Sequence, residues 1–242
     1  MLRSFRNVAA AGCVAMIGLV PAPMLAQSGS AAVDTKMSIY RAGGNTYTTA
    51  TPNGGGLTPF EILLTPGLGR ILRVDATGTA VFCNLTTCPT LSPDGPSIGG
   101  TNLNASGVIS GIVAPTSGFL AGVFLGAGLP GAAPTSLDFT ILGTNFSTLG
   151  TVALGQQFFI GDGKTSGNVQ QLFYVPDGAT RLYLGIADGG SFQGNPDFYA
   201  DNLGTYTARF DISTTVPEPS SVVLIATGLA ALFVVRRRRR VF

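Results

Sequence analysis

The densest group of oxygen-bearing side chains lies between residues 187 and 204 (ADGGSFQGNPDFYADNLG), among glycines that favour a loop. Calcium in proteins takes about six to eight oxygen ligands from carboxylates, side-chain amides and backbone carbonyls, and it tolerates loop geometry. The spacing is not that of an EF-hand, and Asp, Asn and Gly are also typical of ordinary turns. The segment therefore predicts a calcium site, with a plain turn as the alternative. Its donor side chains are Asp188, Asn195, Asp197, Asp201 and Asn202.

Catalytic chemistry finds little support in the residue types. The chain has no His, which excludes Ser-His-Asp and Cys-His arrangements. Two carboxylates can hydrolyse glycosides, but Glu61 is the sole Glu between the chain's two terminal segments, and the Asp residues lie mostly in turn sequences. Residues 161–165 (GDGKT) lack the earlier glycine of a phosphate-binding loop. We therefore expect no enzymatic activity, and a hydrolase is the least favoured alternative.

The elements that must position this loop have the pattern of short strands. Apolar or alternating runs are separated by turn sequences such as Pro66-Gly67 and Pro176-Asp177-Gly178. The pattern predicts an all-β fold, an antiparallel β-sandwich of two sheets. Residues 28–32 are interpreted as a small-residue linker, 43–56 as a glycine-rich loop and 126–135 as a flexible insertion. The expected strands are 60–64, 70–82, 118–125, 137–141, 157–161, 171–175, 181–187 and 206–212.

The charge of the central region differs from that of the whole chain. The full chain has a formal net charge of +2, but residues 27–215 carry seven basic and eleven acidic side chains. The excess of basic residues lies in the two ends. An acidic domain lacks the basic surface that nucleic acids require, so no nucleic-acid partner is expected.

Residues 1–26 have the three parts of a secretory signal peptide. Arg3 and Arg6 precede an apolar helical stretch at 8–20, and Ala26 offers a small residue at the expected cleavage point. The alternative is an uncleaved anchor. Residues 27–56 are then an N-terminal extension or linker, and residues 57–215 form the β-sandwich domain.

Residues 216–242 form a second hydrophobic segment. Pro217, Glu218 and Pro219 precede an apolar run at 222–235, which is short for a stable membrane-spanning helix. Arg236, Arg237 and Arg238 begin a cluster of five arginines that should stay on the cytoplasmic side. The main domain would then lie outside the membrane, and a plain tail anchor is the alternative.

Pro-Glu-Pro, a short apolar helix and a terminal Arg cluster, in that order, resemble the PEP-CTERM sorting signal of Gram-negative bacteria. The resemblance implies export by the secretion machinery, transient insertion in the inner membrane, and removal of the tail by an exosortase. It also implies cells that make extracellular polysaccharide, and a final location at the cell surface or outside the cell.

Cys83 and Cys88 are the two cysteines outside the signal segment. An exported pair in an oxidising compartment predicts a disulfide. A metal site built on these thiols is not expected, because the chain has no His to complete it.

Residues 157–212 and 71–82 resemble parts of the PA-I type galactose-binding bacterial lectins. That resemblance implies a calcium-dependent, jelly-roll-like β-sandwich in which two sugar hydroxyls complete the calcium shell. Matched residue by residue, it implies side-chain ligands at Asp188, Asp201 and Asn202. It implies backbone carbonyl ligands at Phe82 and Phe198.

The same resemblance sets the expected ligand and its alternative. Asp188 and Asp201 would contact the sugar, and Phe192 and Tyr199, in the loop, could stack on it. The loop is longer than in those lectins, and no His matches their sugar-contacting His, so the sugar is not identified. We expect a calcium-dependent lectin-like protein that holds polysaccharide. The alternative is a structural or adhesive protein in which calcium only stabilises the loop.

Overall fold

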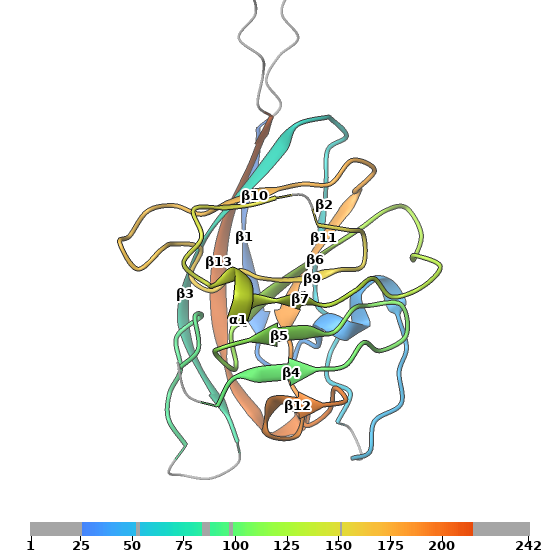
Figure 1. The fold of residues 1–242 in the computed structure, drawn as a ribbon, viewed down its shortest axis with the longest axis vertical. Helices are drawn as coiled ribbons and strands as arrows, with labels where there is room; N and C mark the ends of the chain where they lie inside the picture. Colours follow the sequence, from blue (N-terminus) through green and yellow to red (C-terminus); the bar gives the residue numbers. More distant parts are fainter. Residues whose placement is uncertain (1–25, 52–53, 84–87, 97–98, 151, 215–242) are drawn as a thin grey trace, which may run out of the picture. The chain divides into compact units, whose positions relative to one another are not determined.

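Two long antiparallel strands form the most extensive pairing in the molecule (Figure 1). β3 (Arg70–Phe82) and β13 (Asn202–Thr214) have 13 residues each and pair from one end to the other. The structure is a computed structural model that describes residues 26–51, 54–83, 88–96, 99–150 and 152–214. All of these residues belong to one compact unit, Met24–Pro217.

The described residues are mostly β, with three sheets and little helix, which confirms the predicted class. The first sheet has the order β1 (Gln27–Asp34), β13, β3, β10 (Leu172–Tyr174), β8 (Thr148–Leu149). The second has the order β2 (Phe60–Leu63), β11 (Arg181–Ile186), β6 (Leu120–Leu125), β9 (Gln157–Phe159). The third has the order β12 (Gln193–Gly194), β4 (Thr101–Leu103), β5 (Ile112–Ala114), β7 (Leu137–Asp138).

The third sheet and several parallel pairs depart from the expected pair of antiparallel sheets. β10 with β8, β12 with β4, and β5 with β7 are parallel, over two residue pairs each. Strands of two or three residues are too short to show a period of two in the sequence. The pattern therefore missed β4, β5, β8 and β12, and it also missed the eight-residue β1.

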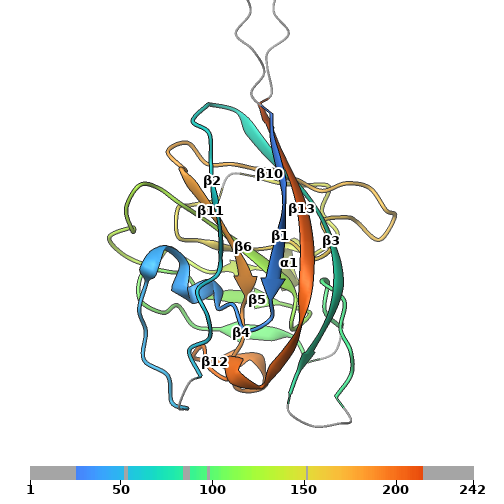
Figure 2. The same cartoon turned by 180° about the vertical axis from the view of Figure 1, so that it is seen from behind.

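Residues 28–32 are not a linker. They lie within β1, which pairs antiparallel with β13 from Gln27 opposite Ile212 to Asp34 opposite Thr205 (Figure 2). Ala31 and Val33 are fully buried while their neighbours face solvent, so the strand does alternate. Its small side chains concealed that alternation, because Ala and Ser do not differ enough in hydropathy to mark two faces.

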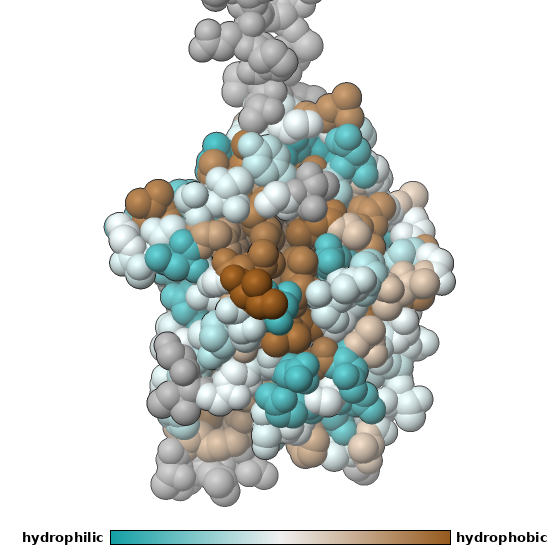
Figure 3. Space-filling view, in the orientation of Figure 1, coloured by the Kyte–Doolittle hydropathy of each residue, from teal (hydrophilic) through white to brown (hydrophobic). Residues whose placement is uncertain are grey.

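The expected strand at 137–141 ends after two residues. The side chain of Asp138 accepts a hydrogen bond from the Thr140 backbone amide at 2.8 Å and caps a single helical turn, α1 (Phe139–Leu142). Gly143, with φ of 74°, ends that turn. Ile141 on α1 is 82% exposed. This face of the molecule also shows an apolar area near its centre (Figure 3).

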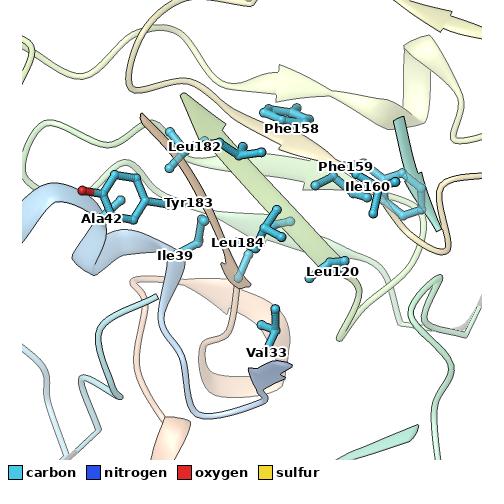
Figure 4. Close-up of a cluster of buried hydrophobic side chains, with 14 of the residues drawn as sticks. Val33, Ile39, Ala42, Leu120, Phe158, Phe159, Ile160, Leu182, Tyr183 and Leu184 are labelled. Atoms are coloured by element: carbon cyan, nitrogen blue, oxygen red, sulfur yellow. The ribbon is translucent and has the colours of Figure 1, made fainter. Parts of the chain in front are cut away.

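The core joins the first two sheets and fixes the strand that leads to the candidate site. Phe158 of β9 packs against Phe173 of β10, with ring centroids 5.6 Å apart. Burial of such side chains contributes about 1.5–3 kcal/mol each. Side chains from β1, the 3₁₀ segment η1 (Ile39–Gly44), β6, β9 and β11 converge here, among them Val33, Ile39, Leu120, Phe158 and Leu184 (Figure 4).

Candidate calcium site

Asp188 lies two residues after β11, where the chain leaves the second sheet. Only 3% of the residue is exposed. Its Oδ1 accepts a hydrogen bond from the Gly189 backbone amide at 2.7 Å, and its Oδ2 accepts one from the Asn202 side-chain amide at 2.8 Å. The carboxylate is thus held between the end of β11 and the first residue of β13.

Asn202 places its amide nitrogen between two oxygen atoms. Nδ2 donates to Asp188 Oδ2 at 2.8 Å and to the Thr35 carbonyl at 2.9 Å. Its Oδ1 is buried and has no hydrogen-bond partner among the described residues. Half a turn of the amide would exchange its two ends. Asn202 Oδ1 would then face the same point as Asp188 Oδ2 and the Thr35 carbonyl, an arrangement that a bound cation would stabilise.

The electrostatic environment of Asp188 also favours a cation. The pKa of Asp188 is raised to about 7 overall. Burial is the largest cause, the hydrogen bonds from Asn202 and Gly189 act to lower the pKa, and the charges of Asp201 and Asp197 act to raise it. Within the described ranges, no Lys or Arg forms an ion pair with Asp188. A buried carboxylate without a cationic partner is costly, and a bound cation would remove that cost.

The donor atoms at this site are of the type that calcium binds, but side chains alone do not supply enough of them. In the part of the chain that the structure describes, no three His, Cys, Asp or Glu side chains gather closely enough to share a metal ion. A calcium ion here would therefore take ligands from one carboxylate, from the Asn202 amide and from backbone carbonyls. All of these are oxygen donors that calcium accepts.

The remaining predicted ligands lie on the segments around this pair. Phe82, the last residue of β3, is the register partner of Asn202. Phe198 has a positive φ of 71°, and its carbonyl accepts a long hydrogen bond of 3.4 Å from the Asp201 backbone amide. Asp201 ends the 3₁₀ turn η3 (Tyr199–Asp201), directly before β13. The structure thus joins Asp188 to Asn202 by a direct contact and places Phe82 opposite Asn202 on the neighbouring strand.

The loop aromatics fall into two groups. Tyr199, predicted to stack on a sugar, is fully buried, donates its hydroxyl to the Ile186 carbonyl at 2.9 Å and accepts the Asp188 amide. Its ring belongs to the core and is closed to a ligand in this conformation. Phe192 is half-buried and packs edge-on against Phe82, with centroids 5.7 Å apart. Phe198 is 42% exposed and is the open aromatic surface of the loop.

Asp197 has a structural task that the sequence did not reveal. Its carboxylate accepts hydrogen bonds from the backbone amides of Ala50, Thr51 and Phe198 and from the Thr51 hydroxyl. Burial acts to raise its pKa, but these hydrogen bonds lower it overall. Asp197 therefore ties the glycine-rich loop to the segment that leads into η3.

Thr35 is a further contributor that sequence reasoning missed. Its carbonyl faces the Asn202 amide, and its hydroxyl donates to the Gly204 carbonyl at 3.1 Å. A carbonyl ligand has no residue preference, so no motif could have marked it. The one available signal was the alternation of Ala31 and Val33 in β1, which continues to the buried Thr35 directly after the strand.

The structure confirms the predicted disulfide and does not describe the two ends of the chain. Cys83 and Cys88 are bonded, with their Cα atoms 6.2 Å apart. The signal segment, the expected terminal helices and the sorting residues Pro217, Glu218, Pro219 and Arg236–Arg238 lie outside the described residues. Among the residues that are described, no helix is long and apolar enough to cross a membrane.

The C-terminal segment matches the family model of the PEP-CTERM protein-sorting motif over residues 215–240. The chain carries a PEP-CTERM sorting signal. Proteins with this motif are exported, and the motif anchors them in the membrane until an exosortase processes it. Searches of curated proteins and of solved structures found no match to this chain, so the lectin resemblance has no support from them.

Proposed function

We propose that this PEP-CTERM protein is a calcium-dependent carbohydrate-binding protein of the cell surface or extracellular matrix. Its tail inserts transiently in the inner membrane and is removed by an exosortase. Its jelly-roll-like β domain then binds calcium at the Asp188–Asn202 site and holds extracellular polysaccharide.

One observation carries the calcium part of this proposal. The Asp188 carboxylate is buried and has no cationic partner among the described residues, and the oxygens of Asp188 and Thr35 converge on the Asn202 amide. Calcium would supply the missing positive charge and would coordinate neutral hydroxyl groups in its remaining positions. The carbonyls of Phe82 and Phe198, on the neighbouring segments, are the further donors that this proposal assigns to the ion, and Asp201 is the predicted contact of the sugar.

The burial of the site favours a second candidate function. Asp188 is 3% exposed and Asn202 is not exposed, so a sugar hydroxyl would reach an ion held between them only if the loop opened. A calcium ion in that position could instead stabilise the loop of a structural or adhesive surface protein.

Thermal unfolding of the full-length protein in mild detergent tests the calcium site. Calcium is first removed on a chelating resin, and then calcium or magnesium is added back. A ligand present at about 100 times its dissociation constant stabilises the folded state by about 2.7 kcal/mol. This corresponds to a rise in Tm of roughly 5–10 °C for a domain of this size. Asp188→Ala should abolish the rise, whereas Asp177→Ala, in an exposed turn, should retain it. An unchanged Tm of the unmodified protein in millimolar calcium would rule out the site.

A glycan array separates the two candidate functions. Retention of glycans that disappears when calcium is withdrawn supports the carbohydrate-binding protein. A calcium-dependent rise in Tm without retention of any glycan supports the structural role.

A further inference from the structure

A second polar site lies away from the Asp188 loop. It is a cavity of about 440 Å³ whose walls come from residues 94–95, 116, 144–145 and 159–168. That volume lies in the range of ordinary small-molecule sites, about 300–1,000 Å³. Its walls are mainly Asp, Asn, Thr, Ser and Lys side chains. Four separate segments thus enclose a space lined with hydrogen-bonding groups.

Two carboxylates line this cavity, and each accepts a hydrogen bond from a backbone amide of residues 162–164. Asp94 Oδ1 accepts a hydrogen bond from the Asp162 backbone amide at 2.8 Å, and Asp162 Oδ1 accepts one from the Lys164 backbone amide at 2.7 Å. Among the described residues, the second oxygen of each carboxylate accepts no hydrogen bond. Each group is therefore fixed in direction and keeps one oxygen available for a ligand.

The turn that holds Asp94 requires a glycine. Gly161 has a φ of 62°, and a Cβ atom at this position would lie 2.2 Å from Asp94 Oδ1. Only glycine lets the carboxylate approach the 161–162 backbone so closely. The Asp94 carboxylate is thus positioned by the fold before any ligand arrives.

The cavity has an excess of negative charge. The cation on its wall, Lys164, is paired with Asp75 at 3.1 Å, which leaves Asp94 and Asp162 without a balancing charge. Burial raises the pKa of Asp94, the hydrogen bond from the Asp162 amide lowers it, and the charge of Asp162 raises it again, with a net increase. A cationic ligand would relieve this crowding of like charges.

The other walls suit a hydroxylated ring. Phe159 lines the cavity and is held in the core by Phe119, with ring centroids 5.0 Å apart. Asn145 accepts the Ser166 amide at 2.7 Å through Oδ1, which leaves its amide nitrogen to donate. These groups offer an apolar surface and hydrogen-bonding partners for ring hydroxyls.

We propose that this cavity binds an amino sugar unit of an extracellular polysaccharide, with its ammonium group between Asp94 and Asp162 and its hydroxyls on the opposite walls. The inference rests on the proposed carbohydrate-binding function, because the chemistry of a paired carboxylate and a polar cavity fits a cationic saccharide. It adds a second saccharide contact, apart from the Asp188 loop at which calcium would bind.

Isothermal titration of the full-length protein with two oligosaccharides tests the inference. The probes are a short glucosamine oligomer and its N-acetylated counterpart of equal length, at slightly acidic pH where the free amine is protonated. The charged oligomer should bind, and the N-acetylated one should bind about tenfold more weakly or less, since it lacks the charge-assisted hydrogen bonds. Equal affinity for both oligomers overturns the inference.

Matched variants locate the binding. Asp94→Asn keeps the shape of the side chain and should weaken glucosamine binding about tenfold or more. Asp177→Asn changes the net charge equally on an exposed turn and should leave binding unchanged. A thermal melt of each variant verifies folding, and Asp162→Asn provides an independent second variant. Full binding by both cavity variants overturns the inference.

The experiments can refute the calcium site and the sugar cavity independently of each other. Loss of the calcium-dependent Tm rise in Asp188→Ala, with glucosamine binding retained, supports two separate sites. A calcium-dependent Tm rise in the unmodified protein, with no binding of either oligomer, refutes the cavity inference and leaves the calcium site standing. Loss of the calcium response in Asp94→Asn would show that the cavity holds calcium and would refute the amino sugar.

Discussion

The side-chain amide of Asn202 donates a 2.8 Å hydrogen bond to the buried carboxylate of Asp188. The two residues are 14 positions apart, and their contact links two sheets, because Asp188 follows β11 of the second sheet and Asn202 begins β13 of the first. The contact closes the long polar loop at its base. Whatever binds there also stabilises the junction between these two sheets.

Replacing the amide by a carboxylate should make folding depend on calcium. Asn202→Asp removes the donor to Asp188 and places two carboxylates together, so the calcium-free protein should lose on the order of 2 kcal/mol of stability. Added calcium should restore most of it. Asn202→Leu also removes the donor but offers no ligand oxygen, so calcium should not rescue it. Thermal unfolding with and without calcium measures both variants, and equal responses would contradict the role of Asn202 as a ligand.

The stability of the calcium-free protein should fall as the pH rises from about 4 to about 7. Burial raises the pKa of Asp188 to about 7 in the folded state, whereas the unfolded chain has the ordinary value near 3.8. In that window the folded state binds more protons than the unfolded state, so raising the pH favours unfolding. The expected loss is on the order of 2–4 kcal/mol. Denaturant titrations across this range measure it, and Asp188→Asn should flatten the profile. An unmodified protein that becomes more stable over the same range would contradict the assignment.

Asp197→Ala should release the glycine-rich loop. The variant deletes the acceptor of four hydrogen bonds that hold Ala50, Thr51 and Phe198, so backbone amides are left without partners. We expect a loss of about 1–3 kcal/mol and faster proteolysis within residues 43–56. Thr51→Val removes one of the four and should have a smaller effect. Mass spectrometry of the fragments locates the cuts, and an unchanged cleavage pattern would refute the anchoring role.

The disulfide should matter little for global stability. Cys83 and Cys88 are five positions apart, so their bond closes a small loop and restricts the unfolded chain only slightly. Cys83→Ser with Cys88→Ser should cost about 2–3 kcal/mol at most, measured by denaturant titration. Collapse of the fold on reduction would show that the bond holds more than its own loop.

The long strands were readable from the sequence because their side chains alternate. Tyr206, Ala208 and Ile212 of β13 are buried, with exposed or half-buried residues between them, and this alternation is what the sequence pattern detected. The β13 strand nevertheless begins four residues before the predicted start. Its first part, from Asn202 to Thr205, has mostly exposed residues and is defined by pairing with β3.

The convergence of Asp188 and Asn202 could be inferred only through resemblance to a known arrangement, since nothing local links them. The contribution of the Thr35 carbonyl could not be predicted from the sequence for the same reason, because its position depends on β1 pairing with β13. For Tyr199, by contrast, the local sequence led to a wrong prediction of exposure. A tyrosine in a polar, glycine-rich segment suggests an exposed ring, yet its hydroxyl hydrogen-bonds to the Ile186 carbonyl and so allows the whole side chain to be buried.

β13 connects the candidate calcium site to the C-terminal segment of the chain. Thr214, at its end, is the last described residue before the sorting signal, and Asn202, at its start, belongs to the candidate calcium site. Thirteen extended residues span about 40 Å. This strand therefore places the candidate calcium site at the end of β13 that is farther, along the chain, from the sorting signal.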